Sequence, residues 1–451
     1  MRKRISAFFS VLAAIVLLTV PASAASSGST LKIICADAGQ VIFTPPGSTQ
    51  YAYRYGPAIL IDGDRIDIWA SAPPLVSNGV RYGNDSIEYI RSTDGGKTWT
   101  EWKTVLYPTL NSEDQWSTCD PGAFKYGDYY YVGYTGSPEF RTNPDKEKQV
   151  NNLFIARAKN PEGPYEKWNG NGWGGDPYAI TRYSGDGVGC SMPSFTVKGD
   201  TLYMYYVDQT HPDQDWNSEG NISVSTFSLK DPNWPGNELS NKMCENKPEE
   251  VRYCPDIDKF IGFQLKGGWD YDSYVEIYES TDGVNFTKTS SFRNNFPHYA
   301  HNIGISGNNL GQLDLSIQNY IGTAYTPTGV EAWWGHWHTQ LIPLYIREEQ
   351  PSSTTSSQPS GSTDSSSRKP TTSSVGSTDG KSSETEVSEP QNSNIESTVS
   401  DDKDKDKEVN NKTEQQEETS YLWLYIVIGA VVVLAGAGTA VYFLVIKKKH
   451  V

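Results

Sequence analysis

One unit recurs five times along the middle of this 451-residue chain. Most copies contain a proline, a short apolar strand, a polar turn and a strand rich in aromatic residues. The copies are "GPAILIDGDRIDIWAS" (56–71), "DPGAFKYGDYYYVGY" (120–134), "MPSFTVKGDTLYMYYV" (192–207), "EVRYCPDIDKFIGFQL" (250–265) and "NIGISGNNLGQLDLSI" (302–317). The fourth copy lacks the early proline, and the fifth is the most degenerate. A repeat of this length constrains the fold more than any other feature of the chain.

Each copy continues into a second pair of short apolar strands, such as "DSIEYIRSTDGGKTWTEW" after the first copy. Two hairpins form a four-stranded sheet, and long helical periodicity is absent from this region. A single sheet of this kind cannot bury its apolar face, so we expect radial stacking of five sheets into a five-bladed β-propeller over residues 30–349. The segment "LKIICAD" (31–37) is expected to close the ring by joining the last blade. A β-sandwich is the alternative fold.

The N-terminus has the pattern of a secretory signal peptide over residues 1–25. Three basic residues precede an apolar run from Ala7 to Val20, and the small-residue segment "PASAASS" follows. Such a segment is removed on export. We therefore expect the propeller to be extracellular.

The C-terminal part is predicted to tether the propeller to a membrane. Residues 350–420 are dominated by Ser, Thr and charged residues, which indicates a disordered stalk. Tyr421 to Ile446 carries no charge and is long enough to span a bilayer as one helix. The three lysines that follow place the tail, residues 447–451, in the cytoplasm. The sequence thus predicts a single-pass cell-membrane protein, which we expect to be monomeric.

Composition excludes some classes of partner. The formal net charge is −16, which disfavours nucleic acids and other polyanions and favours neutral substrates. No cysteine or histidine pattern with zinc-ligand spacing occurs, and we expect neither a metal nor a cofactor. Five cysteines in an exported chain leave at least one unpaired. Cys244–Cys254 and Cys119–Cys190 are the pairs that disulfides could join.

The segment "RSTDGGKTWTEW" (91–102) contains an acidic residue, Asp94, in a glycine-rich turn between two predicted outer strands. A shorter version, "STDGVNF", occurs at 280–286. In such a turn an Asp side chain accepts hydrogen bonds from backbone N–H groups, while glycine adopts positive φ. We interpret Asp94 as a residue that shapes the turn and not as a catalyst.

The candidate site lies where the five inner strands begin, because in a propeller these ends meet at one opening. The residues at that position are Gly56, Asp120, Met192, Glu250, and His301 with Asn302. Cleavage of a glycosidic bond needs one protonated and one ionised carboxyl, and Asp120 and Glu250 are the predicted pair. Asp37, after the closing strand, is a third candidate carboxylate. The predicted substrate-binding residues are Arg54, Arg252, His301, Trp116 and Trp269.

Purely structural roles remain open for the same residues. The alternative for Asp120 is that it caps a turn, and the alternative for Glu250 is that it lies on a solvated loop. Arg54 and Arg252 are equally suited to structural ion pairs. An aromatic-rich opening nevertheless suits sugars, whose apolar C–H faces stack on aromatic rings.

The segments "DPGAFKYGDYYYVGYTG" and "IARAKNPEGPYEKW" resemble blades of the five-bladed glycoside hydrolases of family 43 and their relatives, loosely over residues 30–349. This resemblance implies an Asp general base at Asp120, a Glu general acid before a later inner strand, and an Asp that tunes the pKa. The family's Glu-Gly-Pro is expected where this chain has Ser191-Met192-Pro193. Glu250 is then a substitute in a different blade.

A second resemblance is to sialidases, through the turn motif around Asp94 (the Asp-box) and "YRYGPAIL" (53–60). It implies that Arg54 binds a carboxylate, with Arg252 and Arg293 as candidate partners. Taken together, the sequence predicts a membrane-anchored extracellular glycoside hydrolase that acts on a polysaccharide or oligosaccharide. The alternatives are a non-catalytic glycan-binding or adhesive propeller and a sialidase-like enzyme.

Overall fold

The computed structural model of the chain describes residues 29–46, 52–143, 146–182, 188–210, 220–328 and 335–349. The predicted signal peptide, stalk, membrane helix and tail lie outside these ranges. All the regular elements within them are β-strands. No helix in these ranges is long and apolar enough to cross a membrane.

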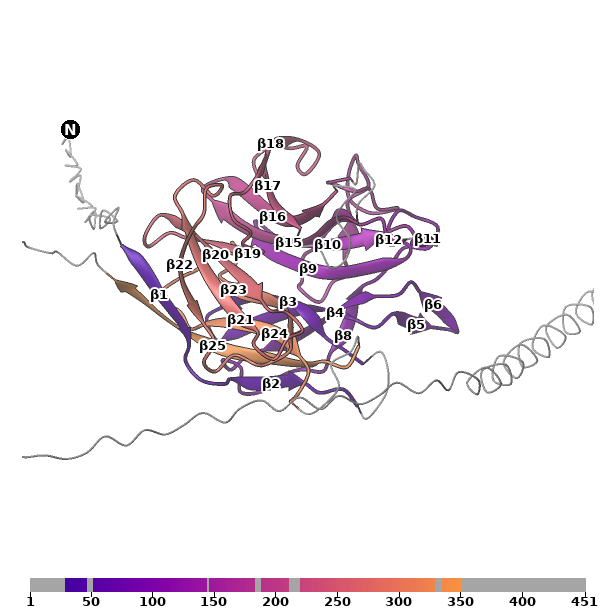
Figure 1. Cartoon of the computed structure of the whole chain (residues 1–451). Helices are drawn as coiled ribbons and strands as arrows, with labels where there is room; N and C mark the ends of the chain where they lie inside the picture. The colour runs from indigo at the N-terminus through magenta and orange to yellow at the C-terminus, as the bar shows by residue number, and fades with distance from the viewer. Residues whose placement is uncertain are drawn as a thin grey trace, which may run out of the picture. The chain divides into compact units, whose positions relative to one another are not determined.

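The strands form five antiparallel groups of four strands, which we call blades 1 to 5 (Figure 1). Blades 1 and 5 are joined into one larger sheet by a parallel pairing of their inner strands. Blade 1 contains β3 (Tyr55–Asp62), β4 (Arg65–Ala72), β7 (Ser86–Ser92) and β8 (Lys103–Leu106). Blade 2 contains β9 (Ser117–Tyr126), β10 (Tyr129–Ser137), β13 (Asn152–Ala158) and β14 (Glu166–Lys167). Blade 3 contains β15 (Gly189–Lys198), β16 (Thr201–Gln209), β17 (Asn221–Ser228) and β18 (Glu238–Met243).

Blade 4 contains β19 (Glu250–Cys254), β20 (Lys259–Lys266), β21 (Tyr274–Ser280) and β22 (Thr287–Phe292). Blade 5 contains β23 (Ala300–Gly307), β24 (Asn319–Tyr325), β25 (His338–Glu349) and β1 (Thr30–Cys35). Strand β2 (Gln40–Phe43) pairs with the start of β25. Two extra hairpins, β5–β6 (Leu75–Ser77, Val80–Tyr82) and β11–β12 (Phe140–Asn143, Lys146–Gln149), extend from blades 1 and 2.

The inner strands β3, β9, β15, β19 and β23 contact one another in this order, and β23 returns to pair with β3. A closed ring of sheets with a separate apolar core between each neighbouring pair is a β-propeller, so the sandwich alternative is wrong. Glycines permit the close approach near the axis. A Cβ atom on Gly304 would lie 1.6 Å from the carbonyl oxygen of Pro57, and one on Gly122 would lie 2.0 Å from that of Pro193.

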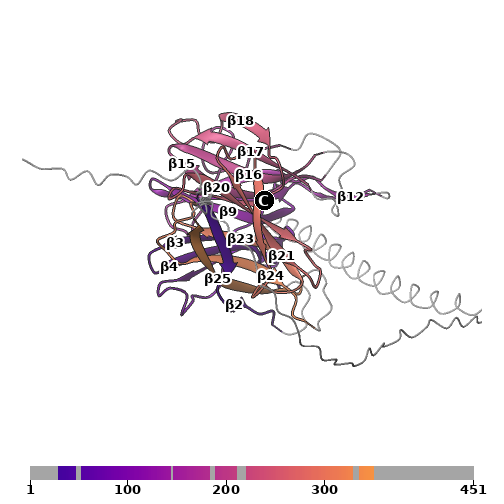
Figure 2. The same cartoon turned by 60° about the vertical axis from the view of Figure 1, so that its left-hand side comes forward.

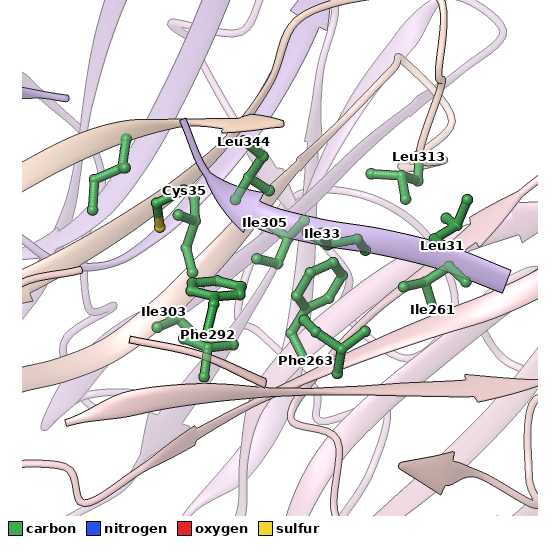
Figure 3. Packing of buried hydrophobic residues seen from close by; sticks show 14 of the residues in the cluster. Leu31, Ile33, Cys35, Ile261, Phe263, Phe292, Ile303, Ile305, Leu313 and Leu344 are labelled. Carbon is green, nitrogen blue, oxygen red and sulfur yellow. The ribbon is translucent and has the colours of Figure 1, made fainter. Parts of the chain in front are cut away.

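The N-terminal strand closes the ring, as expected from the sequence. β1 runs antiparallel to β25 as the outermost strand of blade 5 (Figure 2). Its alternate residues Leu31, Ile33 and Cys35 point into the core between blades 4 and 5, where they meet residues such as Phe263 and Phe292 (Figure 3). The first and last parts of the domain therefore share one sheet.

A loop in blade 5 crosses the end of the channel opposite to the predicted site. The Asn309 and Leu310 carbonyls accept hydrogen bonds from the N–H groups of Lys125 (2.5 Å) and Val197 (3.0 Å). The Leu313 N–H donates to the carbonyl of Tyr253 at 2.9 Å. These contacts tie the loop to the inner strands of blades 2, 3 and 4 at the ends opposite to the predicted site.

The two disulfides considered from the sequence are wrong, because all five cysteines are buried free thiols. Cys244 lies in the core between blades 3 and 4, whereas Cys254 lies in the core between blades 4 and 5. Cys190 packs between blades 2 and 3, and Cys119 packs with Tyr53 and other aromatic residues. Cys244 and Cys254 therefore lie on different faces of blade 4, although they are only ten residues apart in the sequence.

The interpretation of Asp94 agrees with its contacts. Its carboxylate accepts hydrogen bonds from the N–H groups of Lys97 (3.0 Å) and Thr98 (2.9 Å). Asp282 accepts in the same way from Val284 (2.9 Å) and Asn285 (2.8 Å). These aspartates connect β7 to β8 and β21 to β22, so they shape the turns between outer strands.

Ring closure through β1 gives a stability test. Ile33 is 1% exposed, whereas its neighbour Ile34 is 38% exposed. We expect Ile33→Ala to lower the free energy of unfolding by about 3 kcal/mol, because it leaves a cavity in the core. The matched control Ile34→Ala is expected to cost less than about 1 kcal/mol. Urea unfolding followed by tryptophan fluorescence measures both, and equal losses would contradict the closing role of this face.

Candidate functional site

Four of the five inner strands carry a residue with positive φ at the same end of the channel, which we call the mouth. These residues are Gly56 (φ 57°), Asp120 (48°), Met192 (57°) and Asn302 (56°). Each lies where the register of the inner hairpin shifts. Positive φ is unfavourable for residues other than glycine, and such strain is concentrated at functional sites. The repeat alignment had placed these four residues at equivalent positions.

Asp120 is the carboxyl at the centre of this ring. Its backbone N–H donates to the Ser71 hydroxyl at 2.7 Å, which fixes the bulge against blade 1. The Asn302 amide donates to Oδ1 and the Cys119 thiol to Oδ2, both at 3.4 Å. Burial raises the pKa of Asp120 to about 6, although hydrogen bonds from Thr135 and Cys119 act in the opposite direction.

Residues from blades 2 and 5 meet beside Gly56 of blade 1. A Cβ atom on Gly56 would lie 3.6 Å from both the Asp120 Oδ1 atom and the Asn302 Nδ2 atom, which is ordinary van der Waals contact. The positive φ of Gly56, and not a lack of space, therefore favours glycine at this position.

A second buried carboxyl, Asp85, lies beside Asp120 and was not predicted from the sequence. It accepts hydrogen bonds from the Tyr53 hydroxyl (2.6 Å), the Ser117 hydroxyl (2.8 Å) and the Asn84 amide (3.1 Å). Burial raises its pKa, and its charge adds to the rise in the pKa of Asp120. Asp85 precedes a third strand and lies outside the repeated inner hairpin, so the alignment gave no signal for it.

Glu250 starts the inner strand of blade 4, the one blade whose mouth residue has no positive φ among the described residues. Its Oε2 atom lies 2.8 Å from the Arg252 guanidinium and accepts a hydrogen bond from the Ser194 hydroxyl at 3.1 Å. Arg252 also donates to Ser194 and to the carbonyl of Ile305. The pair therefore joins the inner strands of blades 3, 4 and 5, and Arg252 is a structural partner of Glu250.

The two carboxyls have different electrostatic surroundings. Burial raises the pKa of Glu250, and the positive charge of Arg252 acts against this rise. Burial also lowers the pKa of Arg252, opposed by the charge of Glu250. None of the groups that shift the pKa of Asp120 is a cation. The pKa of both carboxyls is raised by burial, and Arg252 partly offsets this rise for Glu250, whereas no cation does so for Asp120.

The structure does not bring Asp37 to the mouth. Asp37 follows β1, the outermost strand of blade 5, and is exposed. Its carboxylate accepts a hydrogen bond from the Gly39 N–H at 2.6 Å, which shapes a local turn. The expectation that it joins the other carboxylates is corrected, because the strand that precedes it lies at the rim and not at the axis.

Arg54 also lies away from the mouth. Its guanidinium forms an ion pair with Glu88 on β7 at 2.5 Å, and it lies over the rings of Phe43 (4.6 Å) and Trp102 (5.6 Å). Burial lowers its pKa, and the charge of Glu88 acts in the opposite direction. These partners belong to outer parts of blades 1 and 5, so the geometry does not support a carboxylate-binding arginine at this position.

Aromatic residues border the mouth on the side of blades 4 and 5. The His301 ring stacks on Trp337 with centroids 4.3 Å apart and lies 4.4 Å from the ring of Trp269. Burial lowers the pKa of His301 to about 3, so the imidazole is neutral at ordinary pH. Trp116 lies just before β9, where its backbone bonds to Ser137 and Asn84. The predicted residues His301 and Trp269 are thus adjacent, and His301 directly precedes Asn302.

The arrangement provides proton transfer by carboxyls and stacking on aromatic rings. The described ranges hold no cluster of three His, Cys, Asp or Glu residues that could bind a metal ion. Asn302 and the hydroxyl groups near Asp120 add polar groups that can form hydrogen bonds. Carboxyls, polar groups and aromatic rings therefore occur together at the mouth.

No family model matches the sequence, and no curated protein matches it. Solved structures with a similar fold include the catalytic domain of a GH62 α-L-arabinofuranosidase from Coprinopsis cinerea, with 12% identity over 70% of this chain and 98% of that chain and a TM-score of 0.47. Zg3597, a family 117 glycoside hydrolase of Zobellia galactanivorans, has 14% identity over 71% and 90%, with a TM-score of 0.45. A thermostable family-43 glycoside hydrolase has 13% identity over 68% and 96%, with a TM-score of 0.45. These neighbours are five-bladed β-propeller enzymes.

The raised pKa of Asp120 predicts a pH-dependent gain in stability on mutation. Between the unfolded pKa of about 3.8 and the folded pKa of about 6, the folded chain binds more protons, so stability falls as the pH rises through this window. We expect Asp120→Asn to raise the free energy of unfolding by up to about 3 kcal/mol at pH 8 and to change it little below about pH 4.

Urea unfolding at the two pH values measures this difference. Asp94→Asn is a control of opposite sign, because hydrogen bonds from Thr98 and Ser92 lower the pKa of Asp94 and stabilise its ionised form. That variant should be destabilised at the higher pH. A loss of stability in Asp120→Asn at the higher pH would show that burial does not destabilise the ionised Asp120 carboxylate.

Proposed function

We propose that this protein is a membrane-tethered extracellular glycoside hydrolase that binds its glycan at the propeller mouth. The observation that carries the proposal is the contrast between two carboxyls at the starts of inner strands. Desolvation raises the pKa of the partly buried Asp120 with no cation among the groups that shift it, whereas Glu250 contacts Arg252. Glycosidases need this combination of a protonated and an ionised carboxyl.

The proposal gives each carboxyl a role, supported by the cation beside Glu250 and its absence among the groups that shift the pKa of Asp120. Below about pH 6 Asp120 is largely protonated, so it donates a proton to the oxygen of the leaving sugar. Glu250, whose ionised form Arg252 favours, activates water or attacks the anomeric carbon. This assignment is the reverse of the general-base role that the resemblance to family 43 implies for Asp120. Asn302 positions the Asp120 carboxyl through its amide.

The substrate class follows from charge and from the aromatic border of the mouth. The chain has a formal net charge of −16, which opposes the approach of anionic glycans. Trp269 and His301 offer aromatic surface beside Asn302 and Asp120. A neutral polysaccharide or oligosaccharide fits both features, and the predicted signal peptide and membrane helix place the reaction at the cell surface.

Substitution of the carboxyls tests the mechanism. We expect the wild-type, full-length protein to release sugar from at least one member of a panel of neutral polysaccharides, measured as reducing ends. Asp120→Asn and Glu250→Gln should each lower kcat by about 100-fold to 10,000-fold, because each removes a proton-transfer or charge-stabilising group. Asp37→Asn is the matched control, since Asp37 is exposed at the rim. Full activity in both mouth variants would refute the assignment.

The pH profile tests the role of Asp120 separately. As the pH rises through about 6, Asp120 loses the proton that it would donate, so kcat is expected to fall on the alkaline side. Asp85→Asn removes a nearby charge that raises the pKa of Asp120, and it should move this limb to lower pH. Rates measured across pH for both proteins check the prediction. An alkaline limb that stays in place in Asp85→Asn would argue against the coupling.

A non-catalytic glycan-binding propeller is the second candidate, and the residues at the mouth give it specific support. Gly56, Met192 and Asn302 carry no carboxyl at three of the five equivalent positions. Glu250 already receives hydrogen bonds from Ser194 and Arg252 and from the Ile305 backbone. Binding of a panel glycan to the wild-type protein without any release of sugar would favour this function over hydrolysis.

A further inference from the structure

We propose that the mouth continues into an aromatic platform, formed by Trp269, Tyr271 and His298, that binds the extended part of a β-linked neutral polysaccharide chain. The proposal rests on the proposed function only in requiring that the mouth binds a glycan. It adds that the ligand is a polymer and that its chain leaves the mouth over blades 4 and 5. Hydrolysis itself is not required.

The platform lies on two loops at the mouth end of blade 4. Residues 267–273 connect β20 to β21, and residues 293–299 lead from β22 to the inner strand of blade 5. Trp269 is 36% exposed and Tyr271 is 51% exposed. The His298 ring stacks on Tyr271 with centroids 3.8 Å apart and an interplanar angle of 17°. Two large aromatic side chains are thus presented to solvent on neighbouring positions.

Backbone hydrogen bonds hold the two loops together. The Trp269 N–H donates to the Ala300 carbonyl and the Tyr299 N–H to the Asp270 carbonyl, each at 2.9 Å. The Ala300 N–H donates to the Ser273 hydroxyl at 3.1 Å. Trp269 and Tyr299 have positive φ, 70° and 52°, a backbone conformation that persists only where the surrounding structure holds it. A surface that is ordered before binding loses little conformational entropy when a ligand arrives.

The platform is continuous with the mouth. The Trp269 ring lies 4.4 Å from His301, and the next residue, Asn302, contacts the Asp120 carboxyl. Trp269 and Tyr271 are two residues apart, so their Cα atoms are separated by at most about 7 Å. This separation lets the two rings contact sugar units that are close together along one chain. A glycan bound near Asp120 would therefore pass over Trp269 before it reached Tyr271.

The aromatic side chains of the platform favour one class of ligand. Tyrosine and tryptophan combine a flat apolar face with a polar tip, so they suit ligands with flat apolar faces edged by polar groups. A β-1,4-linked pyranose chain with equatorial hydroxyls has this form, because its ring faces carry only C–H groups. Asp270 and Asp272 on the same loop disfavour an anionic chain.

The test measures how affinity depends on chain length. The full-length Asp120→Asn protein, which does not consume its ligand, is titrated with xylo- and cello-oligosaccharides from the disaccharide to the hexasaccharide. We expect affinity to rise with length. Adding Tyr271→Ala should weaken hexasaccharide binding about five- to tenfold and leave the disaccharide unaffected. Tyr345→Ala is the matched control, because Tyr345 is 48% exposed on β25, in the half that pairs with β1.

The outcomes separate the platform from the hydrolase proposal. If the wild-type protein releases no sugar but Tyr271→Ala removes the length dependence, the platform stands and hydrolysis fails. Affinity that does not rise with length, or equal effects of Tyr271→Ala and Tyr345→Ala, would overturn the platform while leaving hydrolysis intact. Sedimentation that shows a dimer lost in Tyr271→Ala would overturn it in favour of an interface between two copies.

Discussion

The close approach of five inner strands around one axis is the constraint on which the rest of the structure depends. At Gly304 and Gly122 the neighbouring strand lies where a Cβ atom would be. Such proximity is stable only in a closed ring, and closure requires β1 to complete blade 5 beside β25. The chain thereby buries a continuous series of apolar layers that no single blade could bury.

The same closure determines the chemistry of the mouth. The inner strands crowd at the axis, and residues near the starts of four of them adopt positive φ. Gly56 is buried, and Asp120, Met192 and Asn302 are partly buried. Desolvation then raises the pKa of Asp120, so a residue whose sequence context is only an Asp-Pro turn becomes a weak acid near neutral pH. The raised pKa of Asp120 is therefore a property of its position in the ring and not of its local sequence.

The repeat allowed the five blades, the closing strand and the equivalence of Asp120, Met192 and Asn302 to be predicted, because each depends on local patterns that recur. It could not predict Asp85, which reaches Asp120 through Ser117 and Cys119 from a connection between strands. The sequence also predicted Arg54 and Asp37 at the mouth, where the structure does not place them. Their partners belong to outer strands, and proximity in sequence to an inner strand does not determine the direction of a side chain. The two expected disulfides were wrong for the same reason, because the cysteines of each pair lie in different apolar cores.

Blade 4 breaks the pattern of the other four, and the break makes the mouth asymmetric. Its inner strand begins with Glu250 in place of a strained bulge, and Arg252 fills the space between the strands of blades 3 and 5. One side of the mouth therefore carries a hydrogen bond between Asp120 and Asn302, while the other carries the Glu250–Arg252 ion pair. The two sides differ in the kind of polar group that they present. A symmetric ring of five equivalent residues would not have this polarity.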